Sequence, residues 1–253
     1  MSSEQPVLAV VIGRAGSRGL PGKNAIELAG RPMVCHTIEA ARAAVTVDRI
    51  VVSTDGEAIA AAAEAMSVPV VRRPAELATD TAPVDAAVRH AVVKVWGESG
   101  DTGRVSGGGS GSGGIIVILY ANVPVRPPGL IDRAVTLLVQ TGADSVQSYA
   151  CVGKHHPLWM VALGADQRVT PFLDNAIDRR QDLPRLLIPD GGVIAVTRSS
   201  LLSAPPDGAP HDFLGTDRRG LENAPGEVID VDTAHDLTVA EAMLQRTVAG
   251  GVG

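Results

Sequence analysis

The chain has 253 residues, of which 45% are hydrophobic, 20% are charged and only 2% are aromatic. This apolar content is enough for a sizeable core, and the length suits one large domain or a domain with an appended lobe. The formal net charge of -6 argues against non-specific binding to nucleic acid or to an anionic membrane. The first residues carry no signal-peptide pattern and no apolar run approaches about 18 residues, so we expect a soluble, cytoplasmic protein.

Short apolar runs alternate with segments of helical spacing along the first part of the chain. This alternation predicts an α/β fold with a mostly parallel central sheet and helices on both faces. Ligands bind such sheets beyond the carboxyl ends of the strands, so the loops after Ile12, Ser53 and Tyr120 are expected to form the site. The expected strands are 7–12, 49–53, 69–72 and 115–120, and the expected helices are 33–44, 57–66, 83–96 and 130–141.

The alternation stops between about residues 150 and 189. We therefore predict a single domain over 1–253 that carries a protruding lobe in this segment. Lobes of this kind commonly serve dimerisation, so a homodimer is expected. Ahead of it, the stretch 106–114 consists only of Gly and Ser and is predicted to be a flexible surface loop. His155 and His156 are interpreted as residues that pack the lobe.

The end of the chain is expected to return to the sheet. Residues 192–197 and 228–231 have the character of strands. A closing helix is predicted over 233–244, with Thr233 as its N-cap and Asp236 in its first turn.

A glycine-rich segment with three cations follows the first strand directly, from Gly13 to Asn24, and reads GRAGSRGLPGKN. Glycines let backbone N–H groups approach phosphate oxygens, and Arg14, Arg18 and Lys23 supply charge for a polyphosphate. A purely structural turn would not explain three cations in an acidic chain. The glycine spacing fits neither a Walker A loop nor the dinucleotide-binding fingerprint, which argues against P-loop NTPases and Rossmann dehydrogenases.

This loop resembles that of acylneuraminate cytidylyltransferases, and five further segments recur in the order of that family. The resemblance implies a Rossmann-like nucleotidyltransferase fold with a small dimerisation lobe. It also implies transfer of CMP from CTP to an acidic nine-carbon, sialic acid-like sugar, by in-line attack of the anomeric hydroxyl on the α-phosphorus and release of pyrophosphate. The segments are VVSTD at 51–55, RPAELATDT at 73–81, HPLW at 156–159, RQDLP at 180–184 and IDVD at 229–232.

The resemblance also implies roles for individual residues. Asp230 and Asp232 would hold Mg²⁺; on a regular strand, residues i and i+2 share a face, so both carboxylates can reach one hard cation. The alternative is that these aspartates cap the last helix. Arg180 is expected to reach the active site of the neighbouring subunit. The full set is Arg14, Lys23, Asp230 and Asp232 as catalytic residues, Arg14, Gly16, Ser17, Lys23, Asn24 and Asp80 as nucleotide-binding residues, and Tyr120, Arg126, Arg180 and Gln181 as acceptor-binding residues.

The chain departs from the family pattern mainly in the motifs that concern the sugar. Tyr120 stands where the family has a Gln near the sugar, Asp190 replaces an Asn, and Ile194 replaces a Tyr. The sequence therefore does not identify the acceptor.

Two alternatives stay open. One is a nucleotidyltransferase of another branch, acting on Kdo, a sugar phosphate or a molybdopterin; such enzymes often place a metal-binding Asp after the strand that ends here at Tyr120, and this chain has none there. The other is a non-catalytic paralogue that binds nucleotide. Retention of Lys23, Asp230 and Asp232 speaks against it.

Overall fold

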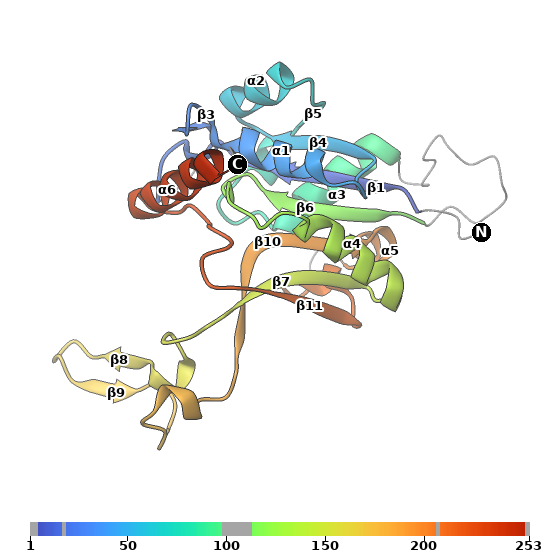
Figure 1. Ribbon diagram of the computed structural model, residues 1–253. Helices are drawn as coiled ribbons and strands as arrows, with labels where there is room; N and C mark the ends of the chain where they lie inside the picture. The colour runs from blue at the N-terminus through green and yellow to red at the C-terminus, as the bar shows by residue number, and fades with distance from the viewer. Residues whose placement is uncertain (1–4, 17–18, 98–112, 206–207, 251–253) are drawn as a thin grey trace.

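A seven-stranded sheet forms the centre of the protein, in the order β11-β7-β10-β6-β1-β4-β5 (Figure 1). The computed structural model describes residues 5–16, 19–97, 113–205 and 208–250. In the described part of this seven-stranded sheet only β10 runs antiparallel to its neighbours, so the predicted mostly parallel sheet is confirmed. The strands are β1 (Val7–Ile12), β4 (Arg49–Thr54), β5 (Val70–Arg72), β6 (Ile115–Tyr120), β7 (Ser145–Cys151), β10 (Leu187–Thr197) and β11 (Arg218–Asn223).

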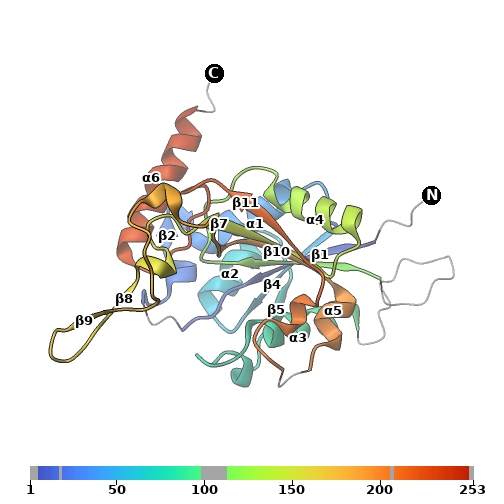
Figure 2. The ribbon, with the colours of Figure 1, turned by 90° about the horizontal axis from the view of Figure 1, so that it is seen from below.

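Helices cover both faces of this sheet, as predicted. Alternate residues of β1 point to opposite faces, and Val7, Ala9 and Val11 belong to a different core cluster from Leu8 and Val10. The first cluster contains α1, α2 and α4, and the second contains α3 and α5, which lie on the other side of the sheet (Figure 2). The helices are α1 (Met33–Ala43), α2 (Glu57–Ala65), α3 (Val84–Trp96), α4 (Leu130–Thr141), α5 (Arg198–Ser203) and α6 (Ala234–Gly250).

The carboxyl ends of the central strands meet at one edge of the sheet. Ile12 at the end of β1 pairs in register with Ser53 of β4 and with Tyr120 of β6. Short elements lie in the segments that follow β1 and β5 along the chain. They are η1 (Lys23–Ala25), β2 (Glu27–Leu28), β3 (Arg31–Pro32) and η2 (Ala75–Leu77).

An arm projects from the sheet between β7 and β10 (Figure 1). It carries η3 (Pro157–Trp159), the hairpin of β8 (Val161–Leu163) and β9 (Val169–Pro171), and η4 (Arg180–Asp182). His156 is buried at its base, where Nδ1 accepts from the Leu158 N–H (3.1 Å) and Nε2 donates to the Pro184 carbonyl (3.1 Å). His156 therefore packs the arm, as interpreted from the sequence.

The closing segment differs from the prediction in one strand. Residues 228–231 do not form a strand: Ile229 makes a single bridge to Val125. The last strand of the sheet is instead β11, and neither β11 nor β7 was predicted. Arg218–Asn223 is a mostly exposed, polar edge strand without an apolar run. The predicted strand at 192–197 is confirmed as the end of β10.

Helix α6 begins with the predicted cap. The Thr233 hydroxyl accepts from the Asp236 N–H (3.3 Å), and Asp236 Oδ2 accepts from the Thr233 N–H (2.8 Å). The helix packs on Leu28 and Met33 and extends further than predicted, to Gly250. No helix in the described part of the chain combines the length and the apolar character that a membrane crossing needs.

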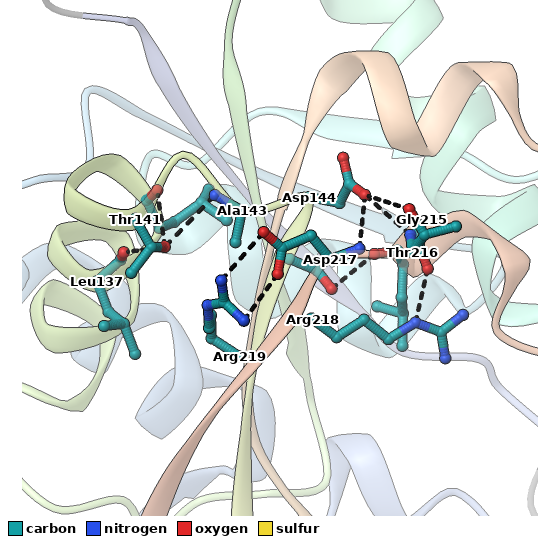
Figure 3. A network of polar contacts seen from close by, with 12 residues as sticks. Leu137, Thr141, Ala143, Asp144, Gly215, Thr216, Asp217, Arg218 and Arg219 are labelled. Atoms are coloured by element: carbon teal, nitrogen blue, oxygen red, sulfur yellow. Dashed lines mark hydrogen bonds and ion pairs between the residues drawn. The ribbon is translucent and has the colours of Figure 1, made fainter.

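The Asp144 carboxylate joins the start of β7 to the segment that leads into β11 (Figure 3). Its Oδ2 accepts from the backbone N–H groups of Thr216 (2.8 Å) and Asp217 (2.9 Å), and its Oδ1 accepts from the Ser200 hydroxyl (3.2 Å). The two backbone hydrogen bonds are the main cause that lowers the pKa of Asp144. A Cβ at Gly215 would lie 2.3 Å from that of Asp144, so only glycine permits this approach.

We expect Asp144→Asn to lower the free energy of unfolding by about 1 kcal/mol at pH 7, because the amide cannot replace all of these hydrogen bonds. A carboxylate with a lowered folded-state pKa stabilises the protein above its unfolded pKa of about 3.9 and loses this contribution as the pH falls through the folded value. The difference between variant and wild type should therefore shrink below about pH 4. Urea midpoints at several pH values measure it, with Glu27→Gln at an exposed site as the control; equal midpoints at pH 7 would contradict this account.

Candidate functional site

A cavity of about 430 Å³ lies at the carboxyl edge of the sheet, above β1 and β6. The glycine-rich loop forms one wall, residues 73–87 form another, and Tyr120, Asn122 and Asp232 close it. Segments far apart in the sequence therefore meet at the place predicted for the site.

The structure brings most of the predicted nucleotide-binding residues together at this cavity. Ser17 lies outside the described residues. Gly16 belongs to the same loop without lining the cavity, and Asp230 lies beside it through a hydrogen bond from the Asn122 amide. The predicted residues that line it are Arg14, Lys23, Asn24, Asp80, Tyr120 and Asp232.

Close contacts hold the glycine-rich loop onto the strand ends. The buried Asn24 donates from Nδ2 to the Arg14 carbonyl (2.9 Å) and so ties the two ends of the loop together. A Cβ at Gly13 would lie 2.9 Å from the Ala121 Cβ, and a Cβ at Gly19 would lie 2.5 Å from the Asp232 carbonyl oxygen. The loop can therefore approach Asp232 only because position 19 has no side chain.

Two ion pairs connect the loop to the opposite walls of the cavity. Arg14 pairs with Asp80, and Lys23 pairs with Asp232. The Lys23 side chain is 14% exposed and that of Asp232 68% exposed, so the cation is held inside and the carboxylate faces solvent. Anionic phosphate oxygens would compete with these carboxylates for the same two cations.

The surroundings of the Asp230 carboxyl disfavour its charged form. Although part of the residue is solvent-exposed, burial of the carboxyl and, to a smaller extent, the neighbouring Asp232 together raise the pKa of Asp230 to about 6, against the opposing effect of Lys23. A bound cation would relieve this repulsion between two carboxylates.

The residues present fit Mg²⁺ as the cation. The described residues contain no group of three or more His, Cys, Asp or Glu side chains that could hold a metal. Mg²⁺ is commonly held by one or two carboxylates together with substrate phosphates, so Asp230 and Asp232 suffice for it. The alternative role of these aspartates as helix caps is filled by Thr233 and Asp236.

The sequence predicted no role for Arg73. This residue lines the cavity and is the first of the segment 73–81, which resembles the family pattern. Its Nη2 donates to the Ser53 carbonyl (3.0 Å), while its Nε is buried with no hydrogen-bond partner among the described residues. Burial lowers the pKa of Arg73, and Asp55 raises it. Asn122 also lines the cavity and was not predicted, although its position just after β6 pointed to the site.

The structure gives Arg126 a structural role beneath the site. Four of its five N–H donors are used: Nε donates to the Gly192 carbonyl (2.6 Å), Nη2 to the Tyr120 carbonyl (3.0 Å), and Nη1 to Thr37 and Val123. Its predicted contact with the sugar stays a prediction.

The other two predicted acceptor-binding residues, Arg180 and Gln181, do not line the cavity of their own chain. They lie in η4, on the arm that projects from the sheet. Their contact with the acceptor likewise stays a prediction.

The chain is similar in sequence to known cytidylyltransferases. Residues 8–107 match the model of the family described as cytidylyltransferase. The chain is 27% identical to an N-acylneuraminate cytidylyltransferase of Streptococcus agalactiae over 91% of its own length and 51% of the relative's. It therefore spans about half the length of that relative.

Two further proteins are similar over nearly their whole length. The CMP-N,N'-diacetyllegionaminic acid synthase of Legionella pneumophila is 29% identical over 94% of this chain and 96% of its own. The solved structure of CMP:2-keto-3-deoxy-manno-octonic acid synthetase complexed with CTP matches with a TM-score of 0.68 at 18% identity, over 96% of this chain and 99% of that one. The latter likeness shows that the fold is shared.

We expect Gly19→Ala to weaken nucleoside triphosphate binding by about tenfold or more, because a methyl group would push the loop away from the Asp232 backbone. Gly113→Ala is the matched control, since a Cβ at this glycine outside the site meets nothing within 4 Å. Calorimetric titration of both variants measures the effect. Equal affinities for the two would show that the contact at Gly19 does not position the loop.

Proposed function

We propose that this protein transfers CMP from CTP to an acidic sugar of the sialic acid type and releases pyrophosphate. The observation that carries this proposal is the meeting of the loop cations Arg14 and Lys23 with Asp232 at one cavity, beside which Asp230 lies. The match of residues 8–107 to the cytidylyltransferase model and the names of the relatives support CTP and an acidic sugar as the substrates.

The residues of the cavity account for the chemistry. Arg14 and Lys23 would exchange their carboxylate partners for phosphate oxygens and offset the charge that develops on the departing pyrophosphate. The sugar hydroxyl attacks the α-phosphorus, the bond to the bridging oxygen breaks, and the hydroxyl proton leaves to solvent. Asp230 and Asp232 would hold Mg²⁺, which when bound would supply positive charge to the phosphates and lower the pKa of the sugar hydroxyl.

A panel of the four nucleoside triphosphates with Mg²⁺ and acidic sugars tests this proposal through pyrophosphate release. We expect release only with CTP plus an acceptor. Asp232→Asn should lower turnover by a factor on the order of 10² or more, because it removes one anionic ligand, while the urea midpoint changes little.

Asp236→Asn is the matched control for this variant. It removes a helix-capping carboxylate, so it should lower stability by about 1 kcal/mol and largely keep turnover. Near-normal turnover of Asp232→Asn at saturating Mg²⁺ would show that the metal is held elsewhere. Preference for another nucleotide would move the protein to a different branch.

We also infer that the arm forms a homodimer and carries Arg180 to the neighbouring active site. Large apolar side chains are exposed along the arm, and Phe172 is 65% exposed. Contiguous exposed apolar surface is typical of a protein–protein contact. The other exposed apolar side chains of the arm and its base are Met160, Val161, Leu163, Val169, Leu173, Leu186, Leu187 and Ile188.

Light scattering at micromolar concentration should therefore give the mass of a dimer. Phe172→Ser should shift the equilibrium toward monomer and reduce turnover, because the arm would no longer reach its neighbour. Val139→Ser, at an exposed valine on α4, removes similar apolar surface elsewhere and should change neither. A wild-type monomer would rule out the dimer.

A further inference from the structure

The segment that carries Asp230 lies outside the strands of the described chain. Ile229 makes one bridge to Val125, where its N–H donates to the Val125 carbonyl (3.3 Å), and the bridge ends there. The alternation of side chains along a regular strand therefore does not set the direction of the Asp230 carboxylate. Contacts from another part of the chain have to set it.

Asn122 makes these contacts from the turn that follows β6. Its backbone carbonyl accepts from the Val231 N–H (2.8 Å), and its side-chain Nδ2 donates to Asp230 Oδ1. The same Nδ2 lies 3.4 Å from the Val231 carbonyl oxygen. The backbone contact thus holds the segment, and the side-chain contact holds the carboxylate.

The turn that carries Asn122 is fixed on both sides. Arg126 donates from Nη2 to the Tyr120 carbonyl (3.0 Å) and from Nη1 to the Val123 carbonyl. The hydroxyl of the buried Thr37 lies 3.2 Å and 3.0 Å from the same two carbonyl oxygens. Asn122 therefore projects from a rigid support, as a residue that orients another side chain requires.

Asp232 is held in a different way. Its carboxylate is 68% exposed and pairs with Lys23. A triphosphate that binds Lys23 would take this partner away, whereas the neutral amide of Asn122 attracts phosphate oxygens less strongly. With nucleotide bound, Asp230 is then the carboxylate whose direction the protein still fixes.

We propose that Asn122 is a positioning residue that orients the Asp230 carboxylate toward the divalent cation. This inference rests on the proposed function, because it takes Asp230 as a metal ligand. An ionised carboxylate offers about four lone-pair positions, so one amide N–H leaves others for the cation. Hydrogen bonds to metal-binding carboxylates hold these ligands in place, and loss of one typically weakens metal binding by about 10- to 100-fold.

Asn122→Ala tests this role, because it removes the amide and keeps the backbone carbonyl that accepts from Val231. The readout is the Kd of Mn²⁺ in the presence of CTP, measured by water-proton relaxation. We expect this Kd to rise about tenfold or more. If the urea midpoint of Asn122→Ala falls strongly, Asn122→Leu replaces it, since leucine fills a similar space without a donor. Unchanged Mn²⁺ affinity in a folded Asn122 variant would overturn the proposal.

Asn223→Ala is the matched control. It removes the same kind of hydrogen bond, from Asn223 Nδ2 to Asp190 Oδ2 (2.7 Å), and neither residue lines the nucleotide cavity. This variant should lower stability, because Asn223 is buried, and leave the Mn²⁺ affinity unchanged. Equal losses of affinity in the two variants would reduce the effect to general destabilisation and overturn the positioning role. If wild-type protein with CTP bound no Mn²⁺, the cation site of the proposed function would itself be wrong.

Discussion

The close approach of the glycine-rich loop to the backbone at Asp232 is the contact on which the site depends. Gly19 has no side chain, so the loop that leaves β1 can rest on the segment that leads into α6. These segments are separated by most of the chain, yet this contact brings Lys23 into an ion pair with Asp232. The cations of the loop and the carboxylates of the closing segment are thereby held on two sides of a single cavity.

The charge distribution in this cavity resolves a difficulty posed by the acidic composition of the chain. A protein with a formal net charge of -6 must concentrate positive charge locally if it is to bind a polyphosphate. Arg14 and Lys23 do so, and Asp80 and Asp232 pair with them. Asp230 lies beside Asp232, and their mutual repulsion makes the pair receptive to a cation. One arrangement thus presents cations suited to a triphosphate and carboxylates suited to a metal.

The sequence predicted the parts of this structure that depend on local pattern. β1, β4 and β6 are continuous apolar runs, and the loop after β1 carries its own glycines and cations, so both were recognised. β11 was not, because a polar edge strand lacks an apolar run, and its place is set by the Asp144 hydrogen bonds from a distant segment. The bonding of Arg126 to backbone carbonyls and the lining role of Arg73 likewise arise from segments that meet only in the folded chain.

The central claim is that the loop and the closing carboxylates form one site for a triphosphate and a divalent cation. Titration of Mn²⁺ as a paramagnetic substitute for Mg²⁺, followed by electron paramagnetic resonance, tests this directly. Two carboxylates alone hold the cation weakly, and one of them is paired with Lys23, so Mn²⁺ should bind markedly more tightly with protein and CTP together than with either alone. Asp232→Asn should remove that gain. Equal binding of Mn²⁺ with and without CTP, or an undiminished gain in Asp232→Asn, would contradict the account.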